Sequence, residues 1–191
     1  NTVNIYIDKD YGNETGLSDF SNISGGDYGD HLRKNISTSS DFGAEIIEID
    51  LPDIDPYLEH WSIICSSEAF MAHSTNYPLR ANEYGDFFRE WLEKGSKVTR
   101  EEYVKATIGR DSCNEIFRKA LLDVDVLMCP TMTDVPFKVT EQSLYGDASE
   151  NNPPISFRRY TIPFDYDGAP TITLPCGFSS DGLPLSFQFV G

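Results

Sequence analysis

The sequence predicts an α/β fold in which helices flank a mixed β-sheet. Residues 3–7 and 44–51 have the composition of strands and are separated by a helical stretch, an order typical of parallel strands joined by a crossover. Residues 169–175 and 185–190 are also strand-like and are joined by a short turn, which predicts an antiparallel hairpin. A sheet that contains both kinds of pair is mixed.

The first quarter of the chain alternates strands with helix. The strand at 3–7 is followed by a polar, glycine-rich stretch, residues 8–30, which we expect to be a mobile insert. A short helix is expected at 31–41, closed by Gly43, because glycine readily ends a helix. The strand at 44–51 then completes the crossover.

A second helix is expected to begin at Asp55. Its carboxylate can accept hydrogen bonds from the free amides of the first turn as an N-cap, and Pro56 suits the first helical position. The apolar residues that follow recur at helical spacing and are Leu58, Trp61, Ile64, Cys65, Ala69 and Ala72.

Two further helices are expected before the next strand. Residues 86–94 carry an apolar stripe and stop at Gly95. Thr99 and Glu102 form a capping box, in which each side chain satisfies a backbone donor of the other residue, and a long helix follows to about Leu122. The inner face of this helix is expected to be Ala106, Gly109, Cys113, Ile116, Phe117 and Ala120.

Composition limits the classes of partner. The chain has 191 residues, of which 39% are hydrophobic, enough for one compact core. It carries 31 Asp and Glu against 15 Lys and Arg, a net charge of −16, so it repels phosphate backbones and anionic lipid surfaces. No apolar run approaches the roughly 18 residues of a membrane helix. We therefore expect neither nucleic acid nor membrane as a partner.

The sequence offers no pattern typical of a metal or cofactor site. Its three histidines and four cysteines are far apart, with no CxxC or HxxxH spacing, so we expect no metal and no other cofactor. No GxSxG elbow supports a serine nucleophile. Of the paired carboxylates, those in residues 165–170 are the most informative, because acids, an aromatic residue and a glycine precede a buried strand, where a loop can line a pocket.

Five segments in order carry a resemblance to a known family. They are Gly43-Ala-Glu-Ile-Ile-Glu-Ile-Asp-Leu-Pro52, Ser67-Glu-Ala69, Asp125-Val-Leu-Met-Cys-Pro-Thr131, residues 163–178 (PFDYDGAPTITLPCGF) and residues 181–191 (DGLPLSFQFVG). Together they resemble the C-terminal part of the amidase signature family of serine hydrolases. The resemblance implies that residues 1–191 form one partial domain of an α/β/α fold.

The resemblance also implies a reaction, the hydrolysis of carboxylic amides through an acyl-enzyme. In that family a lysine and a serine activate a second serine, which attacks the carbonyl carbon while backbone amides hold the oxyanion. These residues belong to a glycine- and serine-rich region that has no counterpart here. We therefore expect no catalytic residue in this segment and expect the missing N-terminal half as a partner, with a homodimer left open. The isolated segment should aggregate, since it would expose a sheet edge.

By resemblance, four residues face a small amide substrate, and they are Thr131, Phe164, Asp165 and Gly168. Asp165 stands where the family usually has asparagine, and a charged acceptor in that place predicts a cationic or hydroxyl-bearing substrate. Two alternatives remain open. One is a non-catalytic binding or scaffolding protein that keeps this half-fold, and the other is the glutaminase subunit of a tRNA-dependent amidotransferase.

Overall fold

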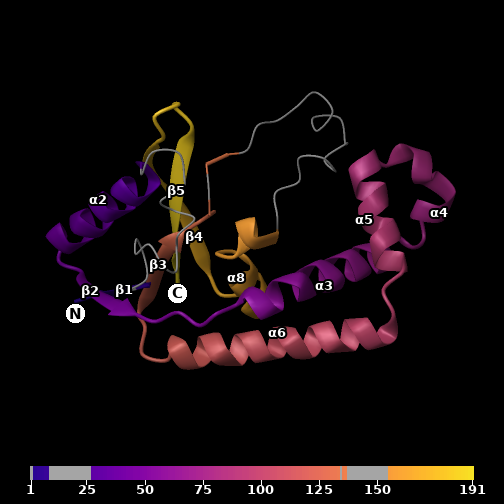
Figure 1. Ribbon diagram of the computed structural model, residues 1–191, viewed down its shortest axis with the longest axis horizontal. Coiled ribbons are helices and arrows are strands. Elements are labelled where there is room, and N and C mark those ends of the chain that lie inside the picture. The colour runs from indigo at the N-terminus through magenta and orange to yellow at the C-terminus, as the bar shows by residue number, and fades with distance from the viewer. Residues whose placement is uncertain (1, 9–26, 134, 137–154) are drawn as a thin grey trace.

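The computed structural model describes residues 2–8, 27–133, 135–136 and 155–191 (Figure 1). Most of the expected mobile insert at 8–30 lies outside these described residues, as do residues 137–154. The two ends of the expected insert are regular structure, however, since Asp8 closes the first strand and residues 27–30 are helical. The helix predicted for 31–41 therefore begins four residues earlier than expected.

The described strands form one mixed sheet, as the sequence predicts. The strands are β1 (Asn4–Asp8), β2 (Glu45–Ile49), β3 (Val126–Pro130), β4 (Thr171–Phe178) and β5 (Pro184–Val190). Their order is β2-β1-β3-β5-β4, so β2 and β4 are the two edges. The β1 strand pairs in parallel with β2 and β3, and β5 pairs antiparallel with β3 and β4. The predicted crossover and the predicted hairpin are both confirmed.

The helices lie on either side of the strands and extend away from them. They are α2 (Asp27–Asp41), α3 (Asp55–His73), α4 (Tyr77–Arg80), α5 (Asp86–Ser96), α6 (Arg100–Ala120) and α8 (Ile162–Asp167), with single 3-10 turns η1 (Ala81–Glu83) and η2 (Ile155–Arg158). In Figure 1, α3 and α6 run side by side, and α4 and α5 lie at the end farther from the sheet. None of the helices in the described segments is long and apolar enough to cross a membrane.

The two predicted helix starts have different outcomes. The capping box is confirmed, because the Glu102 amide donates to Thr99 Oγ1 at 3.2 Å and the Thr99 amide donates to Glu102 Oε2 at 2.8 Å. The expected N-cap at Asp55 is wrong, since Asp55 is already inside α3 and Ile54 occupies the cap position. Asp53 serves this end instead, by accepting the Asp55 amide at 3.0 Å.

Gly95 does not end its helix, contrary to the sequence prediction. The α5 helix continues through Gly95 to Ser96, and Gly95 is buried against α3. A Cβ atom built on Gly95 would overlap the backbone carbonyl of Ser66. The glycine is therefore required by the close approach of two helices, not by a change of backbone direction.

The core lies where the sheet meets α3, α6 and α8. Of the predicted inner face of α6, Ala106, Gly109, Cys113 and Phe117 are buried, whereas Ile116 and Ala120 are half-buried. The buried residues contributed by the other elements include Leu58, Leu127, Ile162, Phe164, Leu185 and Val190. This core fixes α8 against the sheet, and α8 together with its glycine cap carries three of the four residues that the sequence singles out for function.

Candidate functional site

The segment expected to be a substrate-facing loop is a short helix. Residues 162–167 form α8, and Gly168 ends it in the left-handed conformation with φ +73°. The Gly168 amide donates to the Phe164 carbonyl at 3.0 Å, and the Ala169 amide donates to Asp167 Oδ1 at 2.8 Å. The helix and its glycine cap thus give residues 164–168 a fixed shape next to β4.

Asp165 projects from α8 toward α3. The Trp61 indole Nε1 donates to Asp165 Oδ2 at 3.2 Å. Although much of the residue is exposed, its carboxyl group is partly covered, and this burial raises the pKa of Asp165, while the Trp61 hydrogen bond opposes the rise. Asp165 is therefore a carboxylate held in a defined direction by an aromatic donor.

Cys65 lies one turn along α3 from Trp61, and the negative charge of Asp165 also acts on its thiol. Burial, and then the charges of Glu68 and Asp165, raise the pKa of the Cys65 thiol to about 11. Burial likewise raises the pKa of Cys113 and of Cys176 to about 11. These three thiols are therefore protonated at neutral pH and are poor nucleophiles.

Phe164 and Thr131 are less accessible than Asp165 and Gly168. Phe164 is 7% exposed and packs edge-to-face on Phe117, with ring centroids 5.8 Å apart. Thr131 directly follows β3, and its buried Oγ1 has no hydrogen-bond partner among the described residues. The structure thus brings Phe164, Asp165 and Gly168 together on α8, while Thr131 stands at the end of a neighbouring strand.

Gln188 connects these two places, and sequence reasoning missed it. Its side chain, on β5, is 3% exposed and donates through Nε2 to the Pro130 carbonyl at 3.3 Å and to the Tyr160 carbonyl. Pro130 precedes Thr131, and Tyr160 comes just before α8. The available signal was an amide side chain between Phe187 and Phe189 in a strand-like segment.

A cavity of about 410 Å³ lies between α3, α5 and η2, and Trp61 is one of the residues that line it. Four aromatic rings line it, those of Trp61, Phe87, Phe88 and Trp91. The Arg158 guanidinium lies 5.7 Å from the centroid of the Trp61 ring, within cation–π range. Trp61 therefore belongs both to the wall of this cavity and to the Asp165 contact.

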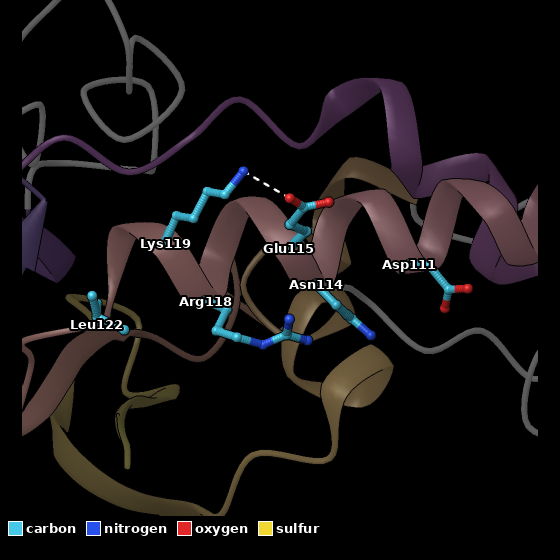
Figure 2. Close-up of a pocket in the computed structure, with 6 residues that line it drawn as sticks. All are labelled: Asp111, Asn114, Glu115, Arg118, Lys119 and Leu122. Atoms are coloured by element: carbon cyan, nitrogen blue, oxygen red, sulfur yellow. Dashed lines mark ion pairs between the residues drawn. The ribbon is translucent and has the colours of Figure 1, made fainter.

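Two further hollows lie along the second half of α6. Figure 2 shows one of about 460 Å³, in which Lys119 and Glu115 point toward each other and form an ion pair of 2.7 Å. Its neighbour, of about 300 Å³, includes Phe164 and Asp167 in its lining, and Asn114 lines both. Asn114 Nδ2 donates to the Tyr166 carbonyl at 3.2 Å, so this residue fastens α8 to α6.

The chemistry of the site is that of binding and positioning. It combines an oriented carboxylate, an aromatic cavity with a guanidinium, and a helix fixed by a glycine cap. Within the described ranges, no group of three or more His, Cys, Asp or Glu side chains is arranged to hold a metal ion.

Comparison with known proteins places the chain among amidases. The family model described as Amidase matches residues 27–191. AmiD of Mycobacterium bovis, whose name assigns it to the amidases, is 32% identical over 124 residues, which are 65% of this chain and 26% of AmiD. A glutamyl-tRNA(Gln) amidotransferase subunit of Methanosarcina barkeri is 32% identical over 186 residues, covering 82% of this chain and 36% of its own length.

Solved structures share the fold. The crystal structure of an amidase superimposes with a TM-score of 0.74 at 22% identity and covers 100% of this chain and 42% of its own. A bacterial aryl acylamidase of the amidase signature family gives the same TM-score at 16% identity, over 100% of this chain and 40% of its own. The chain spans between 26% and 37% of the length of the curated relatives that it matches. Because the family model covers most of its residues, the chain belongs to the amidase signature family.

Proposed function

We propose that these residues act as part of an amidase that cleaves carboxylic amide C–N bonds through an acyl-serine intermediate. The observation that carries the proposal is the rigid placement of Asp165. It stands on a helix fixed by Gly168 and Gln188, and the Trp61 indole orients its carboxylate. Such placement suits a group that must meet a substrate in one geometry.

In this proposal, the catalytic groups and the wall of the substrate pocket come from different parts of the complete protein. A serine Oγ from outside residues 1–191 attacks the amide carbonyl, the amine leaves with a proton, and water then hydrolyses the acyl ester to regenerate the serine. The lysine and second serine of that reaction also come from outside these residues. The strands and helices described here form one wall of the pocket, so they act on binding and orientation.

Asp165 sets the substrate preference in this proposal. A carboxylate accepts hydrogen bonds but donates none when ionised, so it favours a substrate that presents an ammonium, an N–H or an O–H group. Thr131 and Gly168 are proposed to line the same end of the pocket. Phe164 acts indirectly, because its buried side chain anchors α8 in the core.

The test measures how efficiently the complete protein hydrolyses a matched set of neutral, cationic and hydroxyl-bearing amides. Asp165→Asn should lower kcat/KM for the cationic amide about tenfold relative to the neutral one, the size of one lost charge-assisted contact. Asp181→Asn, in the exposed hairpin turn, is the control and should leave the ratio unchanged. An unchanged ratio in Asp165→Asn contradicts the role of Asp165, and the absence of any amide hydrolysis favours a binding or scaffolding protein.

A second candidate is the glutaminase subunit of a tRNA-dependent amidotransferase. The support for this candidate is the length of the match. The glutamyl-tRNA(Gln) amidotransferase subunit of Acaryochloris marina is 29% identical over 84% of this chain, a longer match than that to AmiD. This candidate predicts that partner subunits co-purify with the complete protein and that glutamine is hydrolysed faster than other amides. A stable preparation without partners that prefers other amides would exclude it.

A further inference from the structure

The cavity between α3, α5 and η2 combines aromatic walls with positive charge. The rings of Trp61 and Trp91 face it from two helices, with centroids 6.2 Å apart and planes tilted by 47°. Phe87 and Phe88 add two more rings from α5. Its volume of about 410 Å³ falls within the range of small-molecule sites.

Two cations stand at these rings. Arg158 lies over Trp61, and the Lys94 Nζ lies 5.3 Å from the centroid of the Trp91 ring. Among the residues that the structure describes, no carboxylate lies within ion-pair distance of either cation. The adjacent Arg159 differs, because it pairs with Asp55 at 3.5 Å.

The charge at this cavity is the reverse of that of the chain. The protein has a net charge of −16, yet Arg158 and Lys94 line the cavity against one acid, Glu59. Cys65 also lines the cavity and carries no charge at neutral pH, because its pKa is raised to about 11. Two cations therefore attract an anion that enters the cavity, whereas the net negative charge of the rest of the protein repels it.

We propose that this cavity binds a planar aromatic group that carries an anionic substituent. The ring stacks on the tryptophans, and the anionic group bonds to the Arg158 guanidinium, whose planar fork of donors suits carboxylate and related oxyanions. Lys94 supplies the second charge. The inference goes beyond the proposed hydrolysis, and a binding measurement tests it without reference to catalysis.

The test is calorimetric titration of the complete protein with three probes. Naphthalene-2-sulfonate has both features, 2-naphthol lacks the charge, and cyclohexanesulfonate lacks the aromatic ring. We expect the first to bind to the wild-type protein at least about tenfold more tightly than either of the others. Equal binding of 2-naphthol, or no binding of naphthalene-2-sulfonate, overturns the proposal.

Matched arginine variants locate the site. Arg158→Gln should raise the Kd for naphthalene-2-sulfonate about tenfold, and Arg158→Lys should raise it less, because lysine keeps the charge and loses the planar fork. Arg159→Gln removes a neighbouring charge that does not line the cavity and should leave the Kd unchanged. Thermal melting of each variant shows whether it is folded. Equal effects of Arg158→Gln and Arg159→Gln would assign the binding to general charge and overturn the proposal.

Discussion

The Trp61 indole donates a hydrogen bond to the Asp165 carboxylate at 3.2 Å, which joins α3 to α8 across 104 positions of the sequence. Each residue also has a second environment. Trp61 forms part of the aromatic cavity, and Asp165 stands on the helix that the family resemblance places at the substrate. A substitution of Trp61 should therefore also affect the Asp165 carboxylate, and a substitution of Asp165 should also affect the wall of the cavity.

Asp165→Asn should increase stability at neutral pH. Because burial raises the pKa of Asp165, the folded state binds more protons than the unfolded state above the ordinary aspartate pKa of about 3.9, and stability falls as pH rises from there through the raised pKa. Removing the titrating group removes this loss. Urea unfolding of the complete protein should show the variant more stable than wild type at pH 7, with the difference shrinking below pH 4. A variant less stable at pH 7 would show that the charged form is favoured.

Gly168→Ala should distort the end of α8. At φ +73° an L-residue costs about 1–2 kcal/mol, so the free energy of unfolding should fall by about that amount. Gly43, with φ +93° and open space around it, is the matched control away from α8. Both alanine variants should lose similar stability, but only Gly168→Ala should reduce kcat/KM for amides. An equal loss of activity in both would contradict a local role for α8.

Gly95→Ala should separate α3 from α5. The added methyl group overlaps the Ser66 backbone carbonyl, which belongs to a packed helix and cannot rotate away, so we expect destabilisation of about 2–3 kcal/mol. Gly85→Ala, where no atom lies within 4 Å and φ is −62°, should change the free energy of unfolding by less than about 0.5 kcal/mol. Chemical denaturation measures both. A neutral Gly95→Ala would mean that the two helices lie farther apart.

Gln188→Leu should loosen the connection between β3 and α8. The variant removes the amide that donates to the Pro130 and Tyr160 carbonyls, which we expect to cost about 2–3 kcal/mol. Gln188→Glu should be more destabilising at neutral pH, since an ionised carboxylate would face two carbonyl oxygens, and it should recover part of the loss at acid pH. If Gln188→Glu were as stable as wild type at pH 7, the hydrogen-bond assignment would be wrong.

The sequence predicted the strands and most helices because their signals are local. Strand-like composition identified β1 and β2, and the capping box of Thr99 and Glu102 fixed the start of α6. One error arose where a residue serves a distant partner. Gly95 has the signature of a helix end, but its absent side chain accommodates Ser66, which lies on another helix.

The site residues also differ in whether the sequence identified them or whether their role depends on contacts formed only in the fold. The family resemblance selected Asp165 and Gly168, and the structure adds how they are held, through Trp61 and the left-handed cap. Gln188 was missed because its role depends on two carbonyls that come together only in the fold. The cavity was missed for a similar reason, since its walls come from α3, α5 and η2, and no single segment of the sequence contains its pattern.

The most direct test of the account is to locate the reactive serine in the complete protein. Treatment with a fluorophosphonate, followed by proteolysis and mass spectrometry, identifies the serine that forms the covalent adduct. The account predicts one labelled serine, in a glycine- and serine-rich peptide outside residues 1–191, with loss of amide hydrolysis in step with labelling. A label on a serine within these residues, such as Ser66 or Ser179, or hydrolysis that persists in the fully labelled protein, would contradict it.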